Sequence, residues 1–151
     1  MNLKHYELDA KPDFLSFEFC SLGPKGRIVK HIQFRKLDAP DSQNDIYNLA
    51  FGDYDEKEGR IDDLVVSNNK DSEKILATIA NAVVTFTDRH PDAIVFARGS
   101  TPARTRYYIM GITKYQREIA QSFEIWGAVS EKEWELFRKN QPYKALLAKR
   151  K

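Results

Sequence analysis

The sequence predicts an α+β protein in which strands occupy the first half and helices appear in the second. In the first half, apolar residues alternate with polar ones, which is typical of strands with one buried face. In the second half, apolar residues recur every three or four positions, which is typical of amphipathic helices. Strands followed by mixed elements predict an α+β sheet with helices packed on one face.

The predicted strands of the first half are separated by turn residues. They cover residues 15–19, 28–34, 47–51 and 61–67. The sequence Gly-Pro-Lys-Gly at 23–26 separates the first two, and an acidic turn at 55–59 separates the last two. Four consecutive strands with short connections predict an antiparallel N-terminal β-meander, which later strands extend.

The first predicted helix begins after Asn69 or Asp71, either of which can cap it. Its apolar stripe is Ile75, Leu76, Ile79, Val83 and Phe86. The helix ends at His90, because the residue before a proline disfavours helical backbone. A short apolar strand over residues 93–97 follows.

The second predicted helix begins at Pro102, since a proline is well tolerated at the first helical position. Its buried stripe is Tyr108, Ile112, Tyr115 and Ile119. A strand over residues 125–129 comes next. Ser130 and Glu133 then form a capping box, which predicts a short C-terminal helix carrying Trp134 and Phe137.

The length of 151 residues predicts a single domain, with a loose N-terminus over residues 1–12 and a basic tail over 142–151. Cys20 is the only cysteine, so no internal disulfide forms, and its apolar surroundings predict a buried structural thiol. The N-terminus lacks the apolar segment of a signal peptide, and no stretch approaches the ~20 apolar residues of a membrane span. We therefore expect a cytoplasmic protein without membrane partners.

The strongest candidate site is the segment from Gly99 to Arg106, where a strand ends and a helix begins. The first amides of a helix carry no intrahelical partner and attract anions. The predicted anion-binding residues are Ser100, Thr101, Arg104 and Arg106. In the alternative interpretation Thr101 only caps the helix, Gly99 only fits a turn, and Arg104 pairs with Asp62 or Asp63. The phosphate-binding patterns GxxxxGK[ST] and GxGxxG are absent.

A second candidate is the acidic segment 53–63, which holds six acidic and two basic residues. Clustered carboxylates can bind Mg²⁺ or Ca²⁺, but the spacing does not fit the calcium loop of an EF-hand. We expect a solvated turn with one structural acid, and metal binding is the alternative. Asp53, Asp62 and Asp63 are the candidate acidic partners of the anion site. His5, His31 and His90 lack ligand spacing, so we expect no zinc and no other metal or cofactor.

A third candidate is the mixture of aromatic and basic side chains. Residues 25–36 contain five basic residues and no acidic one. The side chains in question are Arg27, Lys30, His31, Phe34 and Arg35 on a strand, and Arg104, Arg106, Tyr107 and Tyr108 on a helix. Aromatic rings beside cations bind single-stranded nucleic acid. The alternative is that the aromatic rings belong to the core.

Several of these segments together resemble a known family. They are 47–53 (YNLAFGD), Asp62-Asp63 with 67–71 (SNNKD), Lys74, 76–78 (LAT), and 99–101 (GST) with 104–108 (RTRYY). In this combination the chain, from about residue 14 to 137, is similar to an uncharacterised family of small bacterial proteins known only as a domain of unknown function. The resemblance implies a bacterial cytosolic protein and no particular activity. It directs attention to Asp53, Asp62, Asp63, Asn68, Asn69, Ser100 and Arg104 as a group that could meet in space.

Two functions follow from these observations. The first is a non-catalytic binding module for a protein or nucleic-acid partner, in one version as half of a bacterial two-gene system of the toxin–antitoxin kind. The second is an enzyme that acts on a phosphorylated or nucleic-acid substrate, with phosphate held at the Gly99–Thr101 helix start. A structural subunit that forms homo-oligomers through an exposed sheet edge is a third reading.

Overall fold

A computed structural model of the chain describes residues 4–40, 42–55, 57–62 and 69–151. Within them the protein is α+β, with three helices and a mixed, mostly antiparallel arrangement of strands. Contacts divide the chain into two units. The first unit is Asn2–Arg35 with Leu49–Arg89, and the second unit is Lys36–Asn48 with His90–Lys151. A single domain over the whole chain stays a prediction.

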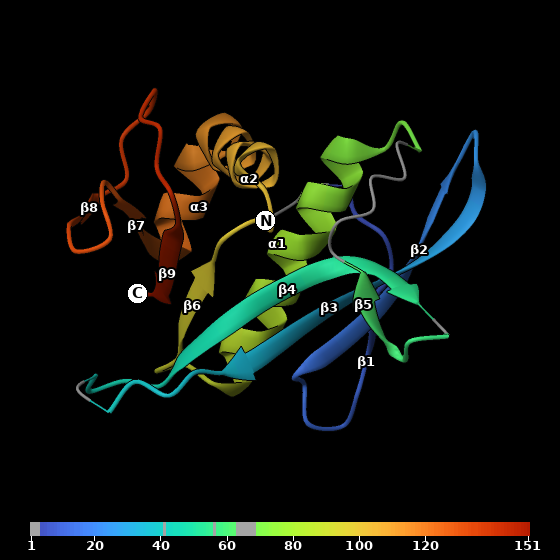
Figure 1. Cartoon of the computed structure of the whole chain (residues 1–151), viewed down its shortest axis with the longest axis horizontal. Coiled ribbons are helices and arrows are strands. Elements are labelled where there is room, and N and C mark those ends of the chain that lie inside the picture. Colours follow the sequence, from blue (N-terminus) through green and yellow to red (C-terminus); the bar gives the residue numbers. More distant parts are fainter. Residues whose placement is uncertain (1–3, 41, 56, 63–68) are drawn as a thin grey trace. The chain divides into compact units, whose positions relative to one another are not determined.

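The first unit is built on a twisted sheet with one helix (Figure 1). Its elements are β1 (Asp9–Ala10), β2 (Ser16–Gly23), β3 (Gly26–Lys36), β4 (Ile46–Asp55), β5 (Arg60–Asp62) and α1 (Ser72–Arg89). The strand order is β1-β2-β3-β4, with β5 also paired to β4. The last residue of β3 and the first three of β4 belong to the second unit. The predicted strand at 61–67 is described only as far as residue 62.

The β2–β3 hairpin closes at the predicted turn. Gly23 pairs with Gly26, and only Pro24 and Lys25 lie between them. Gly26 has φ 85, a backbone conformation that glycine adopts without strain. The turn fixes the register of both strands, and the register decides which side chains share a face.

The core of the first unit lies between the hairpin and α1. Phe17 and Phe19 on β2 are buried together with Ile32 and Phe34 on β3. The ring of Phe34 stacks on that of Phe86 of α1, with centroids 4.2 Å apart. The alternation and the helical stripe that the sequence predicts therefore meet in this core.

The N-terminal segment is more ordered than expected over its described residues. Tyr6 is buried and its ring stacks on Phe19. The Tyr6 amide donates to Thr78 Oγ1 at 2.8 Å, and β1 pairs with β2. The prediction of a loose segment is wrong here, because one aromatic ring gains enough burial to hold the chain against the core.

The second unit contains the remaining elements (Figure 1). They are β6 (Ile94–Ala97), α2 (Pro102–Lys114), α3 (Gln116–Ser122), β7 (Phe123–Ala128), β8 (Trp134–Leu136) and β9 (Leu146–Arg150). β9 pairs antiparallel with both β6 and β7, and β8 pairs with β7. The predicted basic tail is therefore wrong for residues 146–150. Leu146 is buried, and the basic side chains that follow belong to a strand paired on both sides.

The predicted C-terminal helix is also wrong, because Trp134–Leu136 form β8. The amides of Val129 and Ser130 donate to the carbonyl of Glu133, which closes a turn between β7 and β8. The Ser130 hydroxyl accepts a hydrogen bond from the amide of Lys132, two residues later, at 3.4 Å. A capping box would instead require the amide of the third residue, Glu133. Pairing with β7 overrides the local helix signal.

The second predicted helix is interrupted. Tyr115 has φ −113 and ψ 25, which separates α2 from α3. The stripe from Tyr108 to Ile119 therefore spans two helices. Among the described residues, none of the helices combines the length and apolar character that crossing a bilayer requires.

Candidate functional site

The predicted anion corner lies in the second unit, between β6 and α2. Thr101 has extended backbone, and its Oγ1 accepts a hydrogen bond from the Arg104 amide at 3.1 Å. The Gly99 amide donates to Thr105 Oγ1 at 2.9 Å. A Cβ on Gly99 would overlap the Thr105 amide and the Arg104 side chain. These contacts give Thr101 the capping role that the alternative interpretation expected, and they give Gly99 a close-packing role.

The corner nevertheless faces outward. Ser100, Thr101 and Arg106 are exposed and Arg104 is half-buried. The Thr101 hydroxyl and the Arg104 amide already bond to each other, so the donors at this helix start are partly used. Anion binding by these four residues stays a prediction.

The acidic partners expected for this corner lie in the first unit. Asp53 Oδ1 is 2.5 Å from Lys30 Nζ, and the Lys30 side chain is only 3% exposed. Lys30 Nζ also lies 5.8 Å from the centroid of the Phe51 ring. Asp53 therefore neutralises a buried lysine. The side chain of Asp62 and the whole of Asp63 lie outside the described residues. In the described part of the chain, no three His, Cys, Asp or Glu side chains cluster as metal ligands do.

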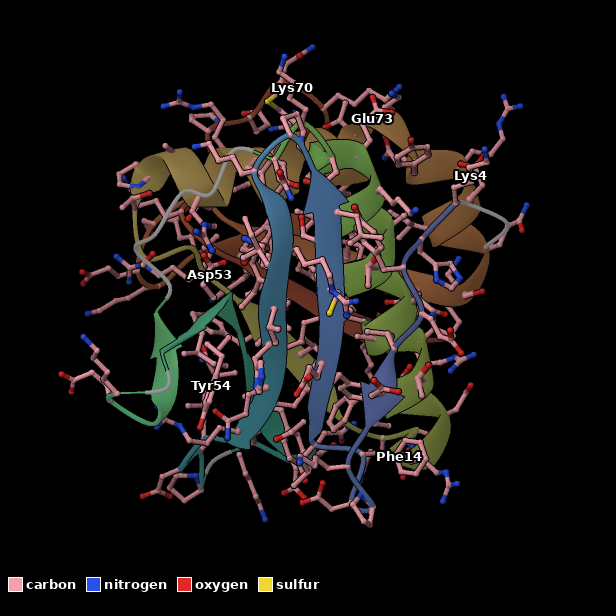
Figure 2. The ribbon with its side chains drawn as sticks, turned by 90° about the vertical axis from the view of Figure 1, so that its right-hand side faces the viewer. Lys4, Phe14, Asp53, Tyr54, Lys70 and Glu73 are labelled. Carbon is pink, nitrogen blue, oxygen red and sulfur yellow. The ribbon has the colours of Figure 1, made fainter. Side chains whose placement is uncertain are left out.

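A polar network joins the start of α1 to the β2–β3 hairpin. Asp71 Oδ2 accepts hydrogen bonds from the Tyr6 hydroxyl and the Ser21 hydroxyl, both at 2.5 Å. Asn69 is 2% exposed, and its amide nitrogen donates to Ser21 Oγ and to the Gly26 carbonyl. Asn69 Oδ1 accepts from the Lys25 amide at 2.7 Å. Figure 2 shows the neighbouring residues Lys70 and Glu73 at the turn end of the hairpin.

This network has a structural role. Burial and the hydrogen bond to Asp71 raise the pKa of Tyr6, so its hydroxyl stays protonated and donates. A Cβ on Gly23 would overlap Asn69, which explains a glycine at this position. The sequence patterns indicated Asn69 and Asp71 as helix caps, and the family resemblance also directed attention to Asn69. The alternation of β2 places the polar residue Ser21 on the same face as Phe17 and Phe19. A polar side chain on a buried face needs a hydrogen-bond partner, so Ser21 was the sequence feature that could have indicated this network.

The opposite side of the hairpin carries a more exposed set of side chains. Residues that face each other across an antiparallel pair share a face of the sheet, and here Glu18 faces His31 and Cys20 faces Val29. We define the open face as Glu18, Cys20 and Leu22 on β2, Arg27, Val29, His31, Gln33 and Arg35 on β3, and Tyr54 on β4. Leu22, Val29 and Tyr54 are 54%, 40% and 39% exposed.

An aromatic stack lies on the open face. The rings of His31 and Tyr54 are 4.3 Å apart and nearly parallel, at 15°. Figure 2 looks onto β2 and β3, with α1 further back, and shows Tyr54 on the β4 side of β3. His31 Nε2 lies 3.3 Å from Glu18 Oε2 without the geometry of a hydrogen bond. Burial lowers the pKa of His31, Glu18 raises it, and Lys11 lowers it further.

The structure separates the basic and aromatic residues that the sequence grouped together. Arg27, His31 and Arg35 belong to the open face, whereas Lys30 and Phe34 are buried on the other. On α2, Tyr108 is buried and Arg106 is exposed. Tyr54 was missed, although the alternation of β4 places it opposite to Phe51. Its stacking partner comes from another strand, which the sequence does not reveal.

Cys20 differs from its predicted state. It lies half-buried on the open face, with Arg27 Nη2 3.4 Å from its sulfur, and is not the fully buried thiol that was expected. The alternation of β2 explains the difference, because Phe17 and Phe19 take the core side and Cys20 takes the other.

The chain belongs to a family of unknown function, DUF6934, whose family model matches residues 2–151. This confirms the resemblance to a family of unknown function and extends it over nearly the whole chain. Searches of curated proteins and of solved structures each found no significant match.

Proposed function

We propose that this member of a family of unknown function is a non-catalytic binding module, and that the open face of the first unit binds nucleic acid. One observation supports this above all. The open face combines a stack of His31 and Tyr54, in which Tyr54 is exposed, with arginines near both ends of β3. Aromatic rings beside cations, on a groove or a sheet, are the usual means of sequence-tolerant nucleic-acid binding.

The charges of the open face support a polyanionic partner. Arg27 and Arg35 are eight residues apart on one strand, which places their backbones about 26 Å apart at the usual rise. Glu18 is the acidic side chain within the face as we define it, and it lies beside His31. Asp9 of β1 faces Glu18 across the β1–β2 pair and adds a second carboxylate at that edge. A backbone of phosphates therefore finds a cation near each end of β3. The opposing charges are Asp9 and Glu18 at the β1 edge and the acidic segment 53–63 that contains Tyr54.

The geometry favours this function over the enzyme alternative. Asp53, one of the two acids that the enzyme alternative offers as metal ligand or base, is paired with Lys30. Thr101 is committed to capping α2. A protein partner is the other reading of the open face, and it requires apolar complementarity to Leu22 and Val29 more than it requires the arginines.

A salt series tests the proposal. We expect the binding of an oligonucleotide to weaken as the salt concentration rises. In a plot of the logarithm of the binding constant against the logarithm of the salt concentration, each phosphate contact on a single strand contributes ~0.7 to the slope. Replacing both Arg27 and Arg35 with alanine should therefore make the slope shallower by about 1.4. The matched control is the double variant Arg117→Ala/Lys139→Ala, which removes two exposed charges from the second unit. Equal slopes for the two double variants, or no oligonucleotide binding at low salt, would overturn the proposal.

The same proposal includes the setting that the sequence suggests. We propose a bacterial cytoplasmic protein that acts as part of a two-gene system, with the N-terminal strands as a meander and the helices on one face of its sheet. A co-transcribed small reading frame beside the gene would support the pairing, and a metabolic operon would contradict it. The third possibility, self-association through a sheet edge, is tested by measuring the molar mass in solution by light scattering.

A further inference from the structure

We infer that the open face selects single-stranded over double-stranded nucleic acid, because Tyr54 offers its ring to an unpaired base. This inference rests on the proposed function and makes it more specific. It follows from the geometry of one aromatic stack, from the shape of the surface around it, and from the spacing of the charges.

The stack is held in place before any ligand arrives. One side of the Tyr54 ring packs almost parallel on His31, while 39% of the residue stays exposed. His31 is itself largely buried, since its side chain is 19% exposed and lies against Glu18. A ring supported in this way loses little conformational freedom when a base extends the stack, which lowers the cost of binding.

The surface around the stack suits a splayed strand. Val29 lies two residues from His31 on the same face, and Leu22 faces Arg27 across the hairpin. These exposed apolar side chains can cover sugars and base faces, which a single strand presents. A duplex keeps its bases stacked and paired, so it offers a sheet surface little except phosphates.

The charges set the length of strand that fits. The arginines of the open face bracket a span of about 26 Å along β3, and a stacking module of this kind covers on the order of 4–16 nucleotides. An oligonucleotide of about twelve nucleotides therefore reaches both arginines with bases over Tyr54. A protein partner would not need unpaired bases. Binding that depends on the presence of bases therefore distinguishes a single-stranded nucleic acid from a protein as the partner of the open face.

The experiment measures fluorescence anisotropy with four labelled probes of about twelve nucleotides. They are a mixed-sequence DNA single strand, the matching RNA, the DNA duplex, and an abasic DNA strand with the same number of phosphates. We expect both single strands to bind on the order of tenfold more tightly than the abasic strand and the duplex, because one stacked base contributes about that factor. The comparison of the DNA and RNA single strands shows whether the affinity depends on the sugar.

Variants locate the effect. Tyr54→Ala and Tyr54→Leu should each weaken single-strand binding by on the order of tenfold and leave abasic binding unchanged, while Tyr54→Phe should bind as the unmodified protein does. Trp134→Ala is the matched control, since Trp134 is an aromatic residue of the second unit with 38% exposure. Circular dichroism and the melting temperature establish that each variant folds.

The outcomes distinguish the two claims. Equal affinity of the unmodified protein for the single strand, the abasic strand and the duplex overturns the stacking inference but leaves nucleic-acid binding in place. Unchanged single-strand affinity in Tyr54→Leu overturns the role of Tyr54. If none of the four probes binds at low salt, the proposed function itself fails. Because the comparison of probes needs only the unmodified protein, it decides the inference even if a variant does not fold.

Discussion

The two faces of β3 use similar side chains for different purposes. Lys30 and His31 are neighbours in sequence, yet they point to opposite sides of the sheet. Lys30 is 3% exposed and bound to Asp53, with its Nζ 5.8 Å from the centroid of the Phe51 ring. His31 supports Tyr54 on the open face. Successive side chains of a strand point to opposite faces of the sheet. A basic run in a strand therefore places some charges in the core, where they stabilise the fold, and the others on the surface, where a partner can reach them.

The largest expected effect comes from the buried face. Asp53→Ala leaves the Lys30 ammonium in the core without its carboxylate, which should lower the free energy of unfolding by about 3 kcal/mol in a urea titration. The double variant Lys30→Met/Asp53→Leu should recover most of that loss, because an apolar pair needs no neutralisation. A loss below about 1 kcal/mol for Asp53→Ala would mean that the ion pair behaves as a surface pair.

The polar network at the end of the hairpin should give the next largest effect. Asp71→Ala removes the acceptor of the Tyr6 and Ser21 hydroxyls and should cost about 2 kcal/mol of stability. Hydrogen exchange at the Tyr6 amide should accelerate as the N-terminal segment loosens. Asp92→Ala, at an exposed residue, is the control and should change stability by less than about 0.5 kcal/mol. Equal stability of the two variants would contradict a structural network.

The open face should respond in binding much more than in stability. Val29 is 40% exposed, so Val29→Lys and Val29→Glu should each change the free energy of unfolding by less than about 1 kcal/mol. Their effects on oligonucleotide affinity should have opposite signs, with lysine strengthening and glutamate weakening it, most clearly at low salt. If both variants bind alike, phosphates do not pass over the centre of β3.

The smallest expected effect is the contribution of His31 to the pH dependence of stability. Burial lowers the pKa of His31 below its ordinary value of 6.5 in the folded state. As the pH falls through 6.5, the unfolded chain takes up this proton first, so the fold loses stability until the pH passes the lowered pKa. Comparing urea midpoints between pH 7.5 and pH 5 should show a smaller decline in His31→Gln than in the unmodified protein. A steeper decline in the variant would mean that the fold favours charged His31.

Much of the fold could be predicted, because local patterns carry it. The alternation in β2 and the stripe from Ile75 to Phe86 are short-range signals of strand and helix. The predictions failed where distant pairing decides. Trp134 follows a good capping sequence but joins a strand beside β7. Leu146–Arg150 carries charges typical of a tail, yet it lies between two strands that the sequence does not bring together.

The candidate site could be predicted only in part, for the same reason. Arg27, His31 and Arg35 were indicated by charge and composition, but their common face required the register set by the Gly23–Gly26 turn. Tyr54 stacks on a strand more than twenty residues away, and no motif indicates that contact. The Gly99–Thr101 corner was found as a motif, and the structure adds the hydrogen bonds by which it caps its own helix.

The most direct test of the central claim is a map of where a single strand binds. Amide resonances of ¹⁵N-labelled protein should be followed while the twelve-nucleotide DNA strand is added. The account predicts that the largest shifts occur at Cys20, Val29, His31 and Tyr54, with small shifts around Thr101 and Arg104. Shifts concentrated at the start of α2, with the strands of the open face unchanged, would contradict it.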